Sequence, residues 1–105
     1  MKMYDVQTSE KSLNDMEAIY DYIAERLLAP NAAMNQYNRI ADAILSLEQA
    51  PERIKVMDSE PEHSKGIRSL IVDKYTVFFV IKGDLVIIAR ILYSASDIKE
   101  RLSIN

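Results

Sequence analysis

The sequence predicts an α+β domain of two layers, in which an antiparallel sheet carries a hairpin of two helices on one face. The first observation is the run Gly66–Asp97, where β-branched and aromatic residues form three strands separated by turns at Asp73-Lys74 and Gly83-Asp84. The second is a pair of apolar stripes with helical spacing ahead of that run. The predicted element order is β-α-α-β-β-β, and the 105 residues are predicted to form a single domain, 1–105.

The first strand and the first helix are predicted from two different spacings of their apolar residues. Met3 to Thr8 shows the alternation of a half-buried strand. The next segment, capped by Ser9 or Ser12, repeats apolar residues at every third or fourth position and stops before Pro30. Its predicted buried stripe consists of Leu13, Met16, Tyr20, Ile23 and Leu27.

Asn31 is predicted to cap the second helix, which Pro51 ends. Since the joint between the helices is very short, they must lie antiparallel, and we expect them to pack on the sheet. A polar connection, Glu52 to Lys65, follows, and a short C-terminal helix comes after the last strand. The second stripe consists of Ala33, Tyr37, Ile40, Ile44 and Leu47, and the side chains of the connection that either pack or form an edge strand are Ile54, Val56 and Met57.

The middle strand is apolar on both sides. Tyr75, Val77, Phe79 and Ile81 form one side, and Thr76, Phe78 and Val80 the other. We therefore expect the sheet either to be covered on much of both faces or to receive a partner protein there.

Composition excludes several kinds of site. The chain has no cysteine, two glycines and one histidine, so it lacks thiol chemistry and a Gly-rich phosphate loop, and we expect no metal and no other cofactor. No apolar run approaches the ~20 residues of a membrane span, and the N-terminus shows no apolar signal segment. We therefore expect a cytoplasmic protein without a membrane partner.

The net charge of −3 is unevenly spread. Residues 1–62 hold 6 Lys/Arg and 12 Asp/Glu, a net of −6, whereas residues 63–105 hold 7 and 4, a net of +3. The second part could present a weakly basic surface; alternatively, the acidic helices are simply well solvated.

Arg68, Arg90 and Tyr93 are the candidate functional residues, because the two arginines lie in an otherwise apolar run. If both face away from the helices, they form a pair of cations suited to phosphate. Alternatively, each pairs with an acid such as Asp73 or Asp97. Tyr93 is either a proton donor or an amphipathic edge residue.

Several stretches together carry a resemblance to a known family. They are the Pro30-x-Ala-Ala opening of the second helix, Gly66-Ile67-Arg68-x-Leu70-x-Val72-x-x-Tyr75 and Ala89-Arg90-Ile91-Leu92-Tyr93-x-x-x-Asp97-Ile98. With the element order, they resemble the RelE/ParE superfamily of toxins, closest to the ParE-like, plasmid-stabilisation branch. The resemblance implies the toxin of a type II toxin–antitoxin pair, neutralised by a small antitoxin that folds on binding and contacts operator DNA on behalf of the complex.

The resemblance leaves three functions open. ParE-like members poison DNA gyrase, and Arg68 and Arg90 would then bind the target. RelE-like members cleave mRNA on the ribosome without a metal, and Arg68, Arg90 and Tyr93 would then be catalytic. A third reading is a non-toxic relative that acts only as a binding partner in repression.

We favour the gyrase reading over the nuclease. Ala95-Ser96 stands where many relatives carry arginine, and only Lys55 and Lys65 could serve as the lysines of the nuclease branch. Tyr93 and His63 are the only groups available for proton transfer. The chain would be an enzyme only if it is a nuclease of the RelE type.

Overall fold

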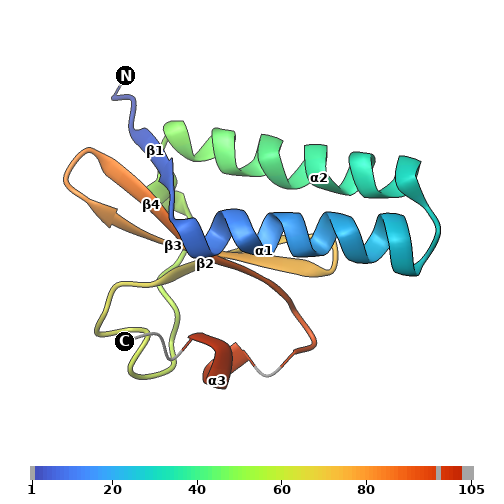
Figure 1. Cartoon of the computed structure of the whole chain (residues 1–105). Coiled ribbons are helices and arrows are strands. Elements are labelled where there is room, and N and C mark those ends of the chain that lie inside the picture. Colours follow the sequence, from blue (N-terminus) through green and yellow to red (C-terminus); the bar gives the residue numbers. More distant parts are fainter. Residues whose placement is uncertain (1, 97, 103–105) are drawn as a thin grey trace.

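The computed structural model describes residues 2–96 and 98–102, and it confirms the predicted two layers. A four-stranded sheet forms one layer, and two long antiparallel helices lie across one of its faces (Figure 1). The strands are β1 (Asp5–Thr8), β2 (Arg68–Val72), β3 (Tyr75–Lys82) and β4 (Leu85–Tyr93). Both predicted turns are confirmed, since Val72 pairs with Tyr75 and Lys82 pairs with Leu85.

The prediction of a fully antiparallel sheet is wrong at one edge. The strand order is β1-β4-β3-β2, and β1 pairs parallel to β4, with Asp5 opposite Leu85 and Thr8 opposite Ile88. The alternation of apolar and polar residues identifies each strand. It does not show whether the first and last strands pair parallel or antiparallel. The sheet is therefore mixed.

The helical hairpin consists of α1 (Glu10–Asp21), the π-helical turn η1 (Tyr22–Arg26) and α2 (Pro30–Leu45). Ser9 caps α1 as predicted, because its hydroxyl accepts the backbone N–H of Ser12 at 3.1 Å. The predicted cap at Asn31 is wrong: the residue at the cap position is Ala29, and α2 begins at Pro30. Proline suits that position, since its fixed φ is already helical and the N–H that it lacks would have no partner there.

The main core lies between the hairpin and the sheet. Met16, Ile40 and Leu47 pack there against Val77 and Phe79 of β3. The second predicted stripe is confirmed except at Tyr37, which is 41% exposed. The remaining buried members of this core are Tyr4, Ile44, Val86, Ile88 and Ile91.

The predicted stripe of the first helix is wrong at both ends, since Leu13 and Leu27 are 54% and 55% exposed. The inward face of α1 carries Ser12, Met16 and Ile23 instead. Ser12 is fully buried, and its hydroxyl donates to the carbonyl oxygen of Ser9 at 2.8 Å. The buried position at the start of the helix is therefore filled by a small serine that is hydrogen-bonded within the helix, and not by a large apolar side chain. Leu13, the next residue, points to one side of the core.

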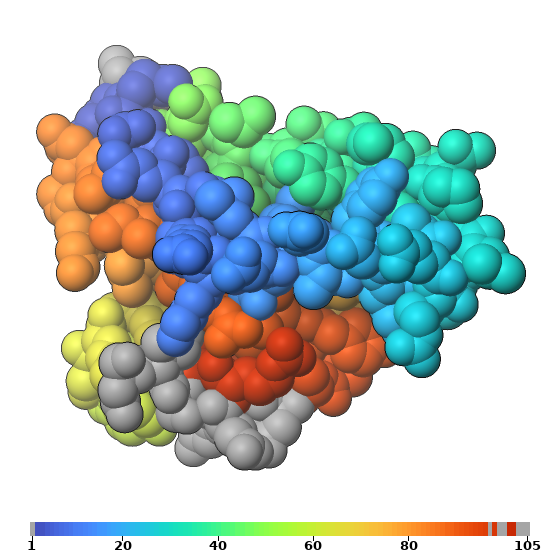
Figure 2. All heavy atoms as spheres, viewed as in Figure 1, coloured from blue at the N-terminus to red at the C-terminus, as the bar shows by residue number. Residues whose placement is uncertain are grey.

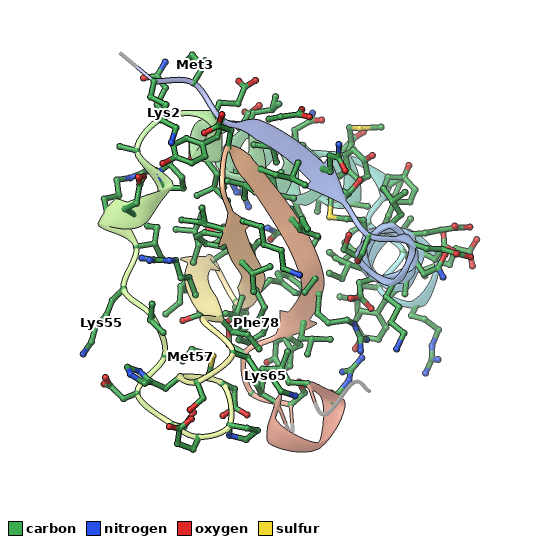
Figure 3. The ribbon with its side chains drawn as sticks, turned by 90° about the vertical axis from the view of Figure 1, so that its left-hand side faces the viewer. Lys2, Met3, Lys55, Met57, Lys65 and Phe78 are labelled. Carbon is green, nitrogen blue, oxygen red and sulfur yellow. The ribbon has the colours of Figure 1, made fainter. Side chains whose placement is uncertain are left out.

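The opposite face of the sheet is covered by the chain itself. Phe78 and Leu92 pack there against Leu102 of α3 (Ile98–Leu102), with Met57 and Ile67 beside them. Figure 3 shows Met57 and Phe78 next to each other between the sheet and the connecting loop. Two short 3-10 turns, η2 (Ser46–Glu48) and η3 (Pro51–Arg53), lead from α2 into that loop. The expectation that both faces are covered is confirmed, and so is the packing of Ile54 and Met57.

A β-bulge changes the orientation of β4. Phe78 pairs with Arg90 and Phe79 with Ile88, so Ala89 has no partner on β3. Ile88 consequently lies in the helix-side core, whereas Arg90 and Leu92 turn toward the other face. A regular strand would place Arg90 on the same face as Ile88 and Leu92, but the bulge leaves only Leu92 on its side.

Candidate functional site

Arg90 is held by an acidic residue of the first helix. Its Nε and Nη2 donate to the two carboxylate oxygens of Asp15 at 2.7 and 2.9 Å, and the side chains of Arg90 and Asp15 are only 15% and 11% exposed. Asp15 also accepts the backbone N–H of Ile91 at 2.9 Å, and Arg90 donates to the carbonyl oxygen of Arg101 at 3.1 Å. The pair therefore ties α1, β4 and α3 together.

Asp15 also raises the pKa of Arg90, because its hydrogen bonds favour the charged guanidinium. The same carboxylate satisfies the N–H of Ile91, which lies beyond the point where β1 stops pairing with β4. The sequence suggested that an acid such as Asp97 pairs with Arg90, but Asp97 lies outside the described residues. The acid found beside Arg90 is Asp15, which is 75 positions away in sequence.

Arg68 has a different environment. Its Nη1 donates to the carbonyl oxygens of Glu52 and Ile54 at 3.2 and 2.5 Å, so it holds the connecting segment against the start of β2. It lies opposite Phe79 in the register and therefore on the helix side, whereas Arg90 lies opposite Phe78 on the other side. The sheet does not bring the two arginines together on one face.

Asp73 was the other acid expected to pair with an arginine. Its carboxylate instead accepts from Arg39 at 2.7 Å and from Gln36 at 3.0 Å, both on α2. These bonds lower the pKa of Asp73, the one to Arg39 having the larger effect. They join the β2–β3 turn to the helical hairpin.

Tyr93 lies in a groove of about 530 Å³ between the helical hairpin and the end of the sheet. The groove lies between α1 with η1, drawn blue, and the end of β4 with α3, drawn orange and red in Figure 2. Tyr93 is 46% exposed, and its ring meets that of Tyr75 edge-on, with 5.9 Å between the centroids. The other lining residues are Asp15, Ala18, Ile19, Tyr22, Leu27, Lys74, Ile91, Leu92 and Arg101.

The π-helical turn η1 contributes one wall of this groove. The backbone N–H of Leu27 donates to the carbonyl oxygen of Tyr22, five residues back, at 3.1 Å. The wider turn buries Ile23 and leaves Tyr22 and Leu27 half-exposed along the groove. Such single π-turns in helices are rare and concentrate at functional sites. Leu28, at the tip of the hairpin, is 83% exposed and has a φ of 55°. A positive φ is a strained backbone conformation for a leucine.

Tyr75 is affected by the other two tyrosines of the groove. Burial raises the pKa of Tyr75, and the nearby phenols of Tyr93 and Tyr22 raise it further. Tyr75 therefore stays protonated at neutral pH and can donate a hydrogen bond, but it is a poor general base.

The remaining proton-transfer and lysine candidates lie elsewhere. His63 contacts the carbonyl oxygen of Met57 through Nδ1 at 2.9 Å, in the loop beside the start of β2, whereas Tyr93 pairs with Tyr75 at the other end of β3. Lys55 points away from the sheet (Figure 3) and pairs with Asp58 at 3.0 Å. Lys65 is exposed on the same loop.

Sequence reasoning found Tyr93 but missed Tyr22, Lys74, Tyr75 and Arg101 as residues of the same groove. Three of them lie in elements that the sequence predicts, but nothing local shows that a helix end, a hairpin turn and a C-terminal helix converge. The signal that could have found Tyr22 is an aromatic side chain near the end of the predicted first helix that stands outside its apolar stripe.

Comparison with known families decides what kind of protein carries this groove. The family model described as the ParE toxin of the type II toxin–antitoxin system parDE matches residues 6–98, most of the chain. The chain belongs to the ParE toxin family. The resemblance seen in the sequence is thereby confirmed, and the protein is a type II toxin–antitoxin toxin of the ParE/RelE kind.

Two solved structures share the fold of this ParE-family chain. A chain of the chromosomal ParDE toxin–antitoxin system from P. aeruginosa is 26% identical, with a TM-score of 0.73, and the match covers 89% of this chain and 98% of that one. A chain of the toxin–antitoxin complex RelBE2 from Mycobacterium tuberculosis is 19% identical, with a TM-score of 0.62 and coverages of 91% and 97%. No curated protein matches the sequence.

Proposed function

We propose that this ParE-family toxin inhibits DNA gyrase and is neutralised by a small antitoxin. The observation that carries the proposal is the match of the ParE toxin family over residues 6–98. Gyrase acts in the cytoplasm, and the proposal therefore expects the chain to act there. Within the described residues, no helix has both the length and the apolar character to cross a membrane.

The geometry around the candidate residues supports a non-nucleolytic toxin. Metal-free RNA cleavage needs a base, an acid and cations around one phosphate. Arg90 is engaged by Asp15, and Arg68 by two backbone carbonyls on the opposite side of the sheet. Tyr93 and His63 lie at opposite ends of the sheet. Among the described residues, the groups named for catalysis are therefore dispersed.

An antitoxin partner is supported by the solved relatives, which are chains of a ParDE system and of the complex RelBE2. We expect the antitoxin to be encoded next to this chain. In this proposal, operator DNA is contacted by the antitoxin, and the toxin contributes only indirectly.

Induced expression in a bacterium, followed by assays with purified gyrase, tests the target. We expect filamentous cells and a raised DNA-damage response while translation continues at first. Purified chain is expected to inhibit supercoiling or to trap cleaved DNA in a gyrase reaction. Ile40→Asp, which should not fold, is the control for non-specific toxicity.

Two other outcomes would each overturn the gyrase proposal. Protein synthesis that stops within minutes, with cuts inside translated mRNA that Tyr93→Phe abolishes, would move the chain to the ribosome-dependent nucleases. Growth unaffected by a soluble, folded chain would identify it as a binding partner in repression without a toxic target.

A further inference from the structure

We propose that the outer side of the helical hairpin, away from the sheet, is a docking site for a basic amphipathic helix of a partner protein. Two rows of apolar side chains border the line along which the helices meet, and we call this surface the hairpin seam. It is separate from the groove that Tyr93 lines. The seam consists of Leu13, Tyr20 and Ala24 from the first helical segment and of Met34, Tyr37, Ala41 and Leu45 from α2.

The spacing of these residues places each row on one side of its helix. Leu13 and Tyr20 are seven positions apart, which is two helical turns. Met34 and Ala41 show the same spacing. The rings of Tyr20 and Tyr37 meet edge-on, with 6.4 Å between their centroids, so both rows lie along the contact between the helices. Figure 2 shows α1, in blue, lying against α2, in green to cyan.

The seam exposes large apolar side chains that the core does not use. Leu13 and Leu45, at the open end of the hairpin, are 54% and 57% exposed. Met34 and Tyr37, nearer its tip, are 47% and 41% exposed. The core draws on a different side of each helix, as the buried Met16 shows. Single exposed apolar residues are ordinary, but a patch of them rimmed by polar residues marks an interaction surface.

The polar residues beside the seam include four exposed carboxylates, Glu10, Glu17 and Asp21 of α1 and Asp42 of α2. Those of α1 are seven and four positions apart, so they follow one side of the helix next to the apolar row. None of the four is ion-paired with a side chain that the structure describes. Arg39 of α2 is held by Asp73 of the β2–β3 turn. Lys11 is two positions from Leu13 and therefore points to the opposite side of α1. The seam thus has an acidic rim.

The charge of this rim selects among partners. Residues 1–62 have a net charge of −6, and the acidic rim is part of it. A second copy docked through the same surface would bring two acidic rims together, and like charges across an interface lower affinity. The phosphates of a nucleic acid would be repelled for the same reason. A segment that carries lysine or arginine beside an apolar stripe matches both the apolar rows and the rim.

The length and shape of the seam fit a helix. Leu13 and Ala24 are eleven positions apart, as are Met34 and Leu45, so at 1.5 Å per residue each apolar row is about 16 Å long. Side-chain ridges of one helix pack into the grooves of another, and peptide helices are recognised through apolar residues at every third or fourth position. The docking segment is therefore a helix of about three turns with basic flanks.

The test measures binding of a designed amphipathic helix of leucine and lysine to the full-length chain by fluorescence anisotropy. A peptide with every lysine replaced by glutamate is the control ligand. Leu45→Gln removes apolar contact from the seam, and Glu17→Lys reverses a charge on its rim. Ile71→Gln and Asp58→Lys are the matched control variants, because Ile71 is 71% exposed on β2 and Asp58 is exposed in the connecting loop. Thermal melting of each variant checks that it folds.

We expect Leu45→Gln and Glu17→Lys each to raise the Kd of the lysine peptide at least fivefold, and the two control variants to stay within twofold of the parent chain. The glutamate peptide should not bind. Added salt should weaken binding to the parent chain more than binding to Glu17→Lys, since one attractive charge is then missing. No binding of the lysine peptide, or one Kd for the parent chain and all four variants, would overturn the docking site.

Sedimentation of the chain alone distinguishes a partner protein from a second copy. We expect the parent chain to be a monomer when no peptide is present. A dimer that Leu45→Gln dissociates and Ile71→Gln leaves intact would mean that a second copy covers the seam, and the assignment of a basic helix would be wrong. These assays involve neither gyrase nor the antitoxin, so the proposed function is tested separately.

Discussion

At the scale of single residues, Asp15 and Arg90 form a junction among three elements. Removing water from two charges is costly, and only good geometry and further hydrogen bonds offset that cost. Here both carboxylate oxygens and the guanidinium are engaged, and the backbone groups of Ile91 and Arg101 complete the set. An arginine inside an apolar strand thus serves to join α1 and α3 to β4.

We expect Arg90→Ala and Asp15→Ala each to destabilise the fold by about 3 kcal/mol, because each leaves a mostly buried charge without its partner. A double-mutant cycle in urea should give a coupling free energy of about 2 kcal/mol between them. The exposed pair of Arg39 and Asp73, 57% and 42% exposed, is the control, and its coupling should not exceed about 1 kcal/mol.

The same experiment separates structure from target binding for Arg90. If Arg90→Ala keeps the melting temperature of the parent and loses inhibition of gyrase, the ion pair contributes little to folding and Arg90 binds the target instead. Arg68→Ala is predicted to loosen the connecting segment, because Arg68 donates to the carbonyl oxygens of Glu52 and Ile54.

At the scale of elements, the sequence predicted which segments are helix and which are strand, and it failed where the backbone departs from a regular period. The bulge at Ala89 shifts Arg90 to the other face of the sheet, although the run Leu85–Tyr93 reads as an ordinary strand. Ser12 takes an inward position that hydrophobicity assigns to a larger residue. Both deviations depend on tertiary partners, which local periodicity does not encode.

Much less of the site than of the fold could be predicted. Tyr93 was recognisable because it ends an apolar strand, but the groove needs residues from five separate elements, α1, η1, β3, β4 and α3, to converge. The partner of Arg90 could not be found either, since Asp15 resembles any acid near the start of a helix. Long-range pairing of this kind becomes visible only once the register of β1 and β4 is known.

Substitution by aspartate should have different effects at two positions of the predicted helical stripes, Leu13 in the first helix and Ile40 in the second. Ile40 is fully buried and Leu13 is 54% exposed. Ile40→Asp should abolish folding, because it buries an unpaired charge, whereas Leu13→Asp should shift the melting temperature by only a few degrees. Circular dichroism melts of the two variants check this, and a folded Ile40→Asp would contradict the helix-on-sheet core.

At the scale of the whole molecule, one sheet separates two cores of unequal size. Ten buried residues form the helix-side core, whereas Phe78, Leu92 and Leu102 form the buried part of the other. Regions with few buried apolar residues open at lower free energy than the rest of a domain. α3 and the connecting loop should therefore open as a unit while the helix-side core stays intact.

Leu47→Ala and Leu102→Ala test this difference, since both side chains are buried, at 0% and 7% exposure, in different cores. Leu47→Ala should destabilise the whole fold by about 3 kcal/mol, because it leaves a cavity between the hairpin and the sheet. Leu102→Ala should cost less globally, since a five-residue helix can shift to fill the space. Its effect should appear in amide hydrogen exchange, as faster exchange in α3 and at Ile67 with unchanged exchange in the centre of β3. If α3 and β3 exchange at one common rate in the parent chain, the two cores unfold together and the second face is an integral part of the fold.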